Sequence, residues 1–474
     1  MRRTFMRASS GVAIAVVALA TQAPVVFGAV ARSGPIAAIA VSTGCDPSGS
    51  TPVPQPTQAE LDAAGLGDIP LAPDSARRDL VAAPFSEPTA VTNPLFPIAE
   101  LRSAILNGRV DGKPFYTETT LLPFTRIVEW APGQCVRVLV SQYMAFLDGR
   151  LTETAIDLYA QADDGSVWYL GEDVFDYDPA GRVPTTEGTW HAGIEGPAAM
   201  IMPSDPQIGD ANRPENIPGN VFEEVTVTKV DQTFEGPTGP ISGGIVATET
   251  HQDGTPSDKL FAPGYGEFRS TDGPDVEAMA LASPTDALPG AAPSELTAIS
   301  DGADRIFMSR LSTSAQWRKA EMVAAGMVDS WNTFRSGDVP SRLVKPTGLT
   351  LRELIEQIAS RDRTKTRAAS IDASYASVDL QLRYRPVTEI DMVRFELWVR
   401  RALVHAIAGS LGGVRSDLVT IEWIRDRFAS AIDGIARTRI DALVGDVGTA
   451  VVDEDLTAAA HAARSIRKVM VTLI

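Results

Sequence analysis

Two carboxylates, Asp157 and Glu172, are predicted to face each other on neighbouring strands of a hairpin. The dipeptide Asp164-Gly165 lies between two runs of alternating apolar residues, and this pattern is the strongest local signal for a two-residue turn. An antiparallel ladder that is symmetric about the turn pairs Asp157 with Glu172. Because like charges directly opposite each other destabilise a sheet, we expect a compensating arginine. A cation, a shared proton and a shifted register are the alternatives.

The same ladder predicts an aromatic strip beside the two carboxylates. It pairs Gln161 with Trp168 and Tyr159 with Leu170, so these four side chains share one face of the hairpin. A strip of this kind favours a small apolar or amphipathic ligand. The candidate ligand-binding residues are therefore Tyr159, Gln161, Trp168 and Leu170.

Oxygen ligands for a hard cation gather in and after the second strand of the hairpin. Asp176, Asp178 and Gly181, followed by Glu187, match the calcium-loop template except at Ala180. Nearby prolines and strand-like flanks predict an ordinary turn there, so no cofactor is expected. If these oxygens do bind an ion, calcium is the ion that they would take. The candidate metal ligands are Asp157, Glu172, Asp173, Asp176 and Asp178.

The sequence lacks motifs for several other kinds of chemistry. The four histidines, His191, His251, His405 and His461, have no helical metal-ligand spacing, which argues against a transition-metal cofactor. The chain contains no Gly-x-Ser-x-Gly elbow, no P-loop and no dinucleotide-binding glycine pattern after a strand. A facing Asp and Glu pair can act as acid and base, and this is the one catalytic arrangement that the sequence offers.

Charge is unevenly distributed along the chain. The formal net charge is −18, and residues 1–290 carry 17 Lys and Arg against 37 Asp and Glu, whereas residues 291–474 carry 25 against 23. The acidic part argues against nucleic acid as a partner, because phosphates repel it. The asymmetry indicates two units of different character.

The N-terminus has the pattern of a targeting segment. Arg2 and Arg3 precede a short apolar run, which predicts a signal peptide over 1–28 and export by the twin-arginine or the ordinary secretory route. No later run of about 20 apolar residues predicts a transmembrane segment in the mature chain. Cys45 lacks the leucine of a lipoprotein site, so lipidation is not expected. Cys45 and Cys135 would form one disulfide or remain two free thiols.

Composition and periodicity divide the remaining chain into four parts. Residues 29–95 are rich in Pro, Ser and Thr and are expected to form a tether. An antiparallel β domain, shaped as a half-barrel or barrel, is expected over 96–283. A proline-rich linker over 284–293 then leads to a helical bundle over 294–474. The expected fold class is α+β with two domains.

Individual elements follow from the same patterns. Residues 203–220 carry several prolines without periodicity and are expected to form a long loop across the sheet. Strands are expected over 115–129, 135–146, 151–162, 167–172, 221–231, 241–251, 258–269 and 275–282. Helices are expected over 294–309, 313–335, 350–361, 364–385, 388–409, 416–441 and 453–472.

The helical part contains one mixed cluster of charged and large apolar residues. Asp379 and Arg383 have i,i+4 spacing, and Asp391 and Arg394 have i,i+3 spacing, which predicts structural ion pairs. The alternative is a docking surface for the β domain or for another protein. Trp398 and Trp423 are the candidate anchors of such a surface.

Five short motifs stand out between residues 93 and 282. They are Asp157-x-Tyr159-Ala160-Gln161, Gly165-x-Val167-Trp168-Tyr169-x-Gly171-Glu172, Glu187-Gly188-x-Trp190, Met202-Pro203 and Ala262-Pro263-Gly264-x-Gly266. Together they resemble an uncharacterised group of exported bacterial β-rich proteins. The resemblance implies an exported β domain and no particular reaction or ligand, and the chain departs from the group at Asn212-Arg213-Pro214. The helical part is similar to C-terminal extensions of some exported actinobacterial proteins.

Three hypotheses for function follow, in order of preference. The first is a non-catalytic binding module that holds a small apolar or amphipathic ligand, or a hard cation, on the β domain. The second is a cell-envelope interaction protein whose helical bundle docks an envelope partner. The third is a hydrolase that uses Asp157 and Glu172 as acid and base.

Overall fold

The computed structural model describes residues 7–8, 12–13 and 49–474. Two short strands near the N-terminus, β1 (Arg7–Ala8) and β2 (Val12–Ala13), pair antiparallel. Most of the predicted signal peptide, together with Cys45, lies outside the described residues. Cys135 is not a free thiol.

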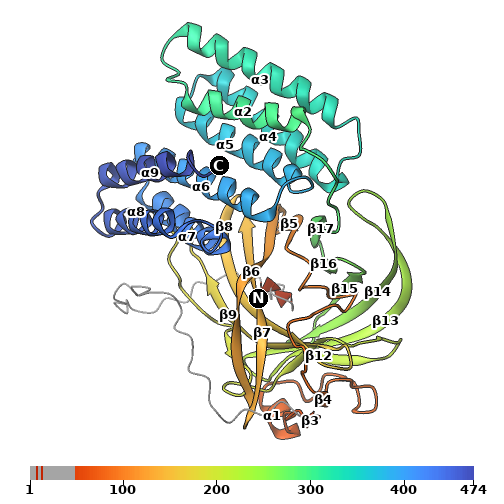
Figure 1. Cartoon of the computed structure of the whole chain (residues 1–474). Coiled ribbons are helices and arrows are strands. Elements are labelled where there is room, and N and C mark those ends of the chain that lie inside the picture. The colour runs from red at the N-terminus through yellow and green to blue at the C-terminus, as the bar shows by residue number, and fades with distance from the viewer. Residues whose placement is uncertain (1–6, 9–11, 14–48) are drawn as a thin grey trace.

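Within the described residues, thirteen strands form one strongly curved antiparallel sheet (Figure 1). The strand order is β10-β9-β8-β7-β6-β5-β17-β16-β15-β14-β13-β12, and β11 pairs with β9. Consecutive strands pair from β5 to β10 and from β12 to β17, which confirms the predicted antiparallel sheet. The strands are β5 (Ser103–Val110), β6 (Lys113–Ala131), β7 (Gln134–Leu147), β8 (Arg150–Gln161), β9 (Val167–Asp176), β10 (Trp190–His191), β11 (Ala199–Met202), β12 (Ala211–Ile217), β13 (Val221–Glu235), β14 (Pro240–His251), β15 (Pro256–Ala262), β16 (Gly266–Asp272) and β17 (Asp275–Ser283).

The two ends of this sheet meet through a side chain. No backbone ladder joins β11 to β12 in the described part of the chain, so the sheet is not closed. Asn212 on β12 instead donates a hydrogen bond from Nδ2 to the carbonyl oxygen of Met200 on β11, at 2.8 Å. The loop predicted over 203–220 is therefore wrong in part. Pro214 is accommodated within β12 where the pairing register shifts between Asn212 and Glu215, as prolines in strands require.

Two further strand predictions need correction. The single strand predicted over 258–269 is a hairpin of β15 and β16, because Gly264 and Gly266 turn the chain with φ of 83° and 75°. Strand β5 was not predicted, although it pairs with both β6 and β17 and brings the first and last long strands together.

Residues 49–95 do not form the predicted tether. They carry β3 (Thr51–Pro52), α1 (Gln58–Ala63) and β4 (Val81–Ala82), and they bury apolar side chains such as Phe85 and Val91. Asn93 donates hydrogen bonds to the carbonyl oxygens of Gly165 and Pro203, each at 3.0 Å. Proline-rich composition predicts an extended chain, and this segment is extended but packed against the sheet. The prediction of a free tether was therefore wrong.

The chain beyond residue 293 is helical, as predicted. Its elements are α2 (Ser294–Met308), α3 (Ser314–Phe334), α4 (Ser341–Ser360), α5 (Arg363–Gln381), α6 (Val387–Ile407), α7 (Leu411–Phe428), α8 (Gly434–Val452) and α9 (Leu456–Met470). The helix predicted over 416–441 is wrong, because α7 ends at Phe428 and α8 starts at Gly434, where the carboxylate of the N-cap residue Asp433 accepts hydrogen bonds from backbone N–H groups. No described helix combines the length and hydropathy needed to cross a membrane.

The helices pack on the convex face of the sheet, above β6, β7 and β8 (Figure 1). Helix α4 is hydrogen-bonded to β5 at the turn that contains its internal proline. Pro346 has no N–H for the carbonyl of Arg342, and the Asn107 side chain donates to that carbonyl at 3.1 Å instead. Buried apolar residues of helices and sheet form one continuous core.

A buried ion cluster joins α5, α6 and α7 to the sheet. Glu118 on β6 lies 2.5 Å from the Arg427 guanidinium and 3.6 Å from that of Arg394. Arg394 also pairs with Asp379 at 2.7 Å and with Asp391 at 3.5 Å. Although burial opposes ionisation of Glu118, the two arginines lower its pKa to about 2. The predicted Asp391–Arg394 pair is confirmed, whereas Asp379 pairs with Arg394 and not with Arg383.

Candidate functional site

The predicted hairpin of β8 and β9 exists, but its turn differs by one residue. Gln161 pairs with Val167, so the loop includes Ala162 to Ser166, and Gly165 adopts a φ of 89°. The Ala162 N–H donates to the Ser166 carbonyl at 2.9 Å. This is the geometry of a turn followed by a glycine bulge, in place of the expected two-residue turn.

A second irregularity lies further along β9 and restores the predicted register. The pairing shifts between Asp157 and Tyr159, beside Gly171, whose φ is 134°. Beyond the shift, Asp157 pairs with Glu172. The predicted carboxylate pair is therefore confirmed, because two one-residue offsets cancel.

The predicted aromatic strip is wrong because it lies between those two offsets. Tyr159 pairs with Tyr169, and Ala160 pairs with Trp168. Since side chains alternate along a strand, Trp168 and Leu170 lie on the face opposite Tyr159. Trp168 is fully buried there and donates from Nε1 to the Ser166 hydroxyl at 2.9 Å.

Gln161 has a structural role at the end of the hairpin. Its Oε1 accepts hydrogen bonds from the backbone N–H groups of Thr92 and Asn93, at 2.9 and 2.8 Å. These bonds attach the segment that precedes β5 to the hairpin. Of the four predicted ligand-binding residues, only Tyr159 borders the cavity described below.

Tyr169, and not the expected arginine, links the two carboxyl groups. Its hydroxyl lies 2.7 Å from Oδ1 of Asp157 and 3.0 Å from Oε2 of Glu172. Glu172 also shares a hydrogen bond with Glu215 on β12. A hydrogen bond between two carboxyl groups needs a proton on one of them, so a shared proton is the compensation that this geometry favours.

The environment of the pair raises both pKa values. Burial raises the pKa of Asp157 to about 7, against the opposing hydrogen bond from Tyr169. Burial and the charge of Asp157 raise the pKa of Glu172 to about 8. At neutral pH the pair therefore holds protons that exposed carboxyl groups would have lost. Oδ2 of Asp157 is buried and has no hydrogen-bond partner among the described residues.

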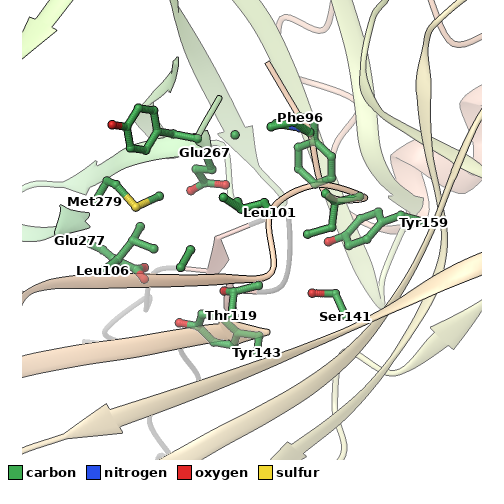
Figure 2. Close-up of a pocket in the computed structure, with 15 residues that line it drawn as sticks. Phe96, Leu101, Leu106, Thr119, Ser141, Tyr143, Tyr159, Glu267, Glu277 and Met279 are labelled. Atoms are coloured by element: carbon green, nitrogen blue, oxygen red, sulfur yellow. The ribbon is translucent and has the colours of Figure 1, made fainter. Parts of the chain in front are cut away.

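A cavity lies beside this pair on the concave face of the sheet, and we call it the concave cavity (Figure 2). It has a volume of about 60 Å³, which grows to about 550 Å³ when the adjoining space open to solvent is included. Strands β5, β6, β7, β8, β16 and β17 and the segment before β5 supply its walls. The residues that line it are Phe96, Pro97, Ile98, Leu101, Ala104, Leu106, Thr119, Ser141, Tyr143, Tyr159, Tyr265, Gly266, Glu267, Glu277 and Met279.

Two hydroxyl groups in the wall of the concave cavity lack hydrogen-bond partners. Ser141 Oγ and Tyr143 Oη are buried and find none among the described residues. Buried polar groups are nearly always paired, and an unpaired one costs about 1–3 kcal/mol. Ser141 is also the strand partner of Asp157. The cavity wall therefore offers two hydroxyl groups whose hydrogen-bonding capacity is unused among the described residues.

Two carboxyl groups lie together at one end of the concave cavity (Figure 2). Glu277 on β17 accepts a hydrogen bond from the Thr117 hydroxyl at 2.6 Å, and burial raises its pKa to about 8. Glu267 on β16 lies 3.7 Å from the Lys259 ammonium. The opposite wall is apolar, with Phe96 packed edge-on against Tyr159 at 5.0 Å between ring centroids.

Sequence reasoning missed this end of the site. Glu277 is a buried acid near the start of β17, two residues after Asp275 and before the apolar run 278–282, and it pairs with Gly108 on β5. An acid at an inward position of an apolar strand was the available signal. Ser141 and Tyr143 carry no comparable signal, because such residues are common in strands.

A separate cluster on the concave face has ligands of the kind that hold metals. Among the described residues, Glu223, Glu249 and His251 each offer an atom within 4.8 Å of the others. Lys259 lies 2.8 Å from Glu249, and the His251 nitrogens lie 3.2 Å from Glu223 and 3.0 Å from Ser257. Although burial opposes protonation of His251, the bond with Glu223 and the charge of Glu249 raise its pKa to about 9. Two cationic side chains thus already balance these acids.

The five predicted metal ligands do not converge. Asp157 and Glu172 lie on the concave face, whereas Asp173 lies on the opposite face and pairs with Arg126 at 3.0 Å and His191 at 3.1 Å. Asp176 is four residue pairs along the ladder from Glu172, opposite Glu153. The Asp178 carboxylate accepts N–H bonds from Ala180 and Arg182, at 2.8 and 2.9 Å. This bonding stabilises a tight turn, which accounts for the match to the calcium template.

Both predicted anchor tryptophans contact the sheet of their own chain. Trp398 on α6 stacks on Phe146 of β7, with ring centroids 5.7 Å apart. Trp423 on α7 donates from Nε1 to the Tyr177 hydroxyl at 2.8 Å. Both side chains are buried. The docking surface was expected to contact either the β domain or another protein. These contacts are with the β domain.

Comparisons with protein-family models and with curated proteins found no match. The chemistry of the site therefore rests on its own residues.

Proposed function

We propose that this chain is an exported, non-catalytic binding protein that holds a small amphipathic molecule in the concave cavity. The observation that carries the proposal is the pairing of unsatisfied hydroxyls with an apolar wall in one cavity. Ser141 and Tyr143 offer hydrogen bonds to a polar group, while Phe96, Leu101 and Met279 offer apolar contact. Ligand sites in proteins typically combine a mainly apolar lining with a few placed polar groups.

The size of the cavity limits the ligand. The cavity volume of about 60 Å³ is less than half of the roughly 150 Å³ of an engineered cavity that binds benzene. The cavity itself therefore accommodates a polar head with one or two carbons. The remainder of the ligand would extend into the part of the cavity that opens to solvent.

Export is supported by the sequence alone. The basic start at Arg2 and Arg3 and the apolar run after it are the supporting features. An export reporter fused to the N-terminal segment tests this. Loss of export in the Arg2→Lys, Arg3→Lys variant would identify the twin-arginine route, and unchanged export would assign the ordinary secretory route. Retention of the unaltered reporter in the cytoplasm would refute export.

The other two hypotheses have less support. The envelope-docking hypothesis relied on Trp398 and Trp423, and both are buried against the sheet. The hydrolase hypothesis needs a water or nucleophile positioned beside Asp157 and Glu172, and no motif in the sequence supplies one. Neither has an observation that favours it over ligand binding.

Binding is tested by titrating the purified full chain with linear alcohols of about four to eight carbons and following its Tm. We expect Tm to rise with alcohol concentration in the unaltered chain. The variant Leu106→Trp fills the cavity and should abolish the rise, whereas Leu349→Trp, at an exposed helical position, should retain it. Equal responses of both variants, each with an intact melting transition, would refute binding in the concave cavity.

A further inference from the structure

The concave face of the sheet is rich in carboxyl groups. Among the described residues, register and burial place nine of them there, on seven strands, and the cationic side chains that pair with them are Lys259 and His251. A low-dielectric interior lined by one sign of charge attracts the opposite sign. The carboxyl residues are Glu153, Asp157, Glu172, Asp176, Glu215, Glu223, Glu249, Glu267 and Glu277.

Two of these acids border the concave cavity at the same end as an unpaired hydroxyl. Figure 2 shows Glu267 and Glu277 on either side of Met279, at the end of the cavity away from Tyr159, with Tyr143 on the β7 wall at that end. The Tyr143 side chain is 1% exposed, and its hydroxyl has no partner among the described residues. Two carboxyl groups and a hydroxyl oxygen are three hydrogen-bond acceptors, and a group with three N–H donors matches them.

The rest of the cavity wall suits a hydrocarbon chain that carries a cation. Phe96, Leu101, Leu106 and Met279 form the apolar side. The ring of Tyr143 adds an aromatic group, and aromatic faces attract ammonium groups that are removed from water. A metal ion would instead need a shell of oxygen ligands without this apolar surface.

We propose that the ligand of the concave cavity is an alkylammonium ion, with its nitrogen among Glu267, Glu277 and the Tyr143 hydroxyl and its hydrocarbon chain against Phe96 and Met279. This inference rests on the proposed binding function and adds the charge and chemical class of the ligand. Lys259 does not line the cavity, and it pairs with Glu249 at 2.8 Å and with Glu267 at 3.7 Å. Glu277 is thus the acid whose charge the ligand would balance.

Binding of the ammonium ion should release a proton near neutral pH. Burial keeps the pKa of Glu277 at about 8, and the groups that face it are Glu267, Lys259, Tyr143 and the Thr117 hydroxyl. A bound cation stabilises the ionised carboxylate, so the complex holds fewer protons than the free protein. Affinity for the ammonium ion should therefore rise by up to about tenfold per pH unit between pH 6 and 8.

The test is calorimetric titration of the full chain with three probes that share one hydrocarbon chain: hexylammonium, hexanol and hexanoate. We expect hexylammonium to bind at least about tenfold more tightly than hexanol at pH 8, and hexanoate to bind more weakly than both. Equal or tighter binding of hexanol or hexanoate would refute the ammonium assignment and leave ligand binding intact. Failure of all three probes to bind would refute both proposals.

A matched pair of variants locates the charge. Glu277→Gln preserves size and should reduce hexylammonium affinity at least about tenfold, with little change for hexanol. Glu87→Gln, at an exposed position, should leave both affinities unchanged. A tenfold preference for hexylammonium that persists in folded Glu277→Gln protein would overturn the assigned position. If Glu277→Gln does not fold, the three-probe comparison on the unaltered chain still decides the ligand class.

Discussion

The Tyr169 hydroxyl lies 2.7 Å from Oδ1 of Asp157, and this bond replaces the arginine that a buried acid usually requires. A phenol can donate to one carboxylate and accept from a protonated carboxyl group at the same time. Its 3.0 Å separation from Glu172 fits the second role. The pair is therefore stabilised by protons and the Tyr169 hydroxyl, and no cationic side chain among the described residues pairs with it.

Removing this hydroxyl should destabilise the protein. Tyr169→Phe keeps the ring but leaves the Asp157 carboxyl without its donor, so we expect the free energy of unfolding to fall by about 1–3 kcal/mol. Urea unfolding followed by tryptophan fluorescence measures the change. Tyr384→Phe, at a partly exposed position, is the control and should change stability by less than about 0.5 kcal/mol. Equal effects of the two variants would contradict the bridging role of Tyr169.

Stability should decrease as the pH rises from about 4.5 to 8. The unfolded chain loses the protons of Asp157 and Glu172 at ordinary carboxyl values of 3.8 and 4.5, whereas the folded protein keeps them to about 7 and 8. The folded state binds more protons across this window, so each group lowers the free energy of unfolding by up to about 1.4 kcal/mol per pH unit. Below pH 4.5 the sign reverses, because Glu118, with a pKa of about 2, loses its stabilising charge as the pH falls.

The pH dependence has a specific control. Asp157→Asn cannot ionise, so the slope of Tm against pH between 5 and 7 should become shallower in this variant. Asp74→Asn, at an exposed position, should keep the slope of the unaltered protein. An unchanged slope in folded Asp157→Asn protein would show that other groups cause the dependence.

The buried ion cluster predicts a strongly non-additive pair of substitutions. Arg427→Met leaves Glu118 with one arginine fewer and should cost about 3–5 kcal/mol, because an uncompensated buried charge remains. Adding Glu118→Gln removes that charge and should recover part of the loss. Arg385→Met breaks an exposed i,i+4 pair with Glu389 and should cost less than about 1 kcal/mol. Additive effects in the double variant, measured by urea unfolding, would contradict the cluster's role.

The glycine at the β9 irregularity predicts a large effect from one methyl group. A Cβ on Gly171 would lie 2.6 Å from the Trp190 carbonyl oxygen, and its φ of 134° is unfavourable for alanine. Gly171→Ala should therefore cost more than about 2 kcal/mol. At Gly112 the φ is 73° and no atom lies within 4 Å of the added Cβ, so Gly112→Ala should cost about 1–2 kcal/mol. A smaller loss at Gly171 than at Gly112 would show that the backbone there relaxes freely.

Periodicity predicted the sheet, the helical part and the Asp157–Glu172 pair, because each depends on patterns that repeat along several residues. It failed for the Tyr159–Trp168 strip, where a bulge reverses the face of each residue between Gly165 and Gly171. A one-residue slip has this effect in any strand. The bulge positions could not be predicted from the sequence, because a glycine alone does not show which neighbouring strand its backbone approaches.

Contacts between distant segments limited the rest of the prediction. Glu267 and Glu277 meet Tyr143 only because β5 pairs with β17, and strand order is not encoded in local patterns. The segment 49–95 was misassigned for a similar reason. Its prolines suit an extended chain, but whether such a chain is free or packed depends on the surface that it crosses.

The Glu118 cluster also has a consequence for how the protein folds. A fragment that ends before residue 284 would keep Glu118 on β6 but lose Arg394 and Arg427. Its sheet would then carry an uncompensated carboxylate on a face that becomes exposed to solvent. The helices would in turn lose the anion that neutralises their guanidinium groups. The sheet and the helices therefore depend on each other for charge compensation. The chain should unfold in a single cooperative transition.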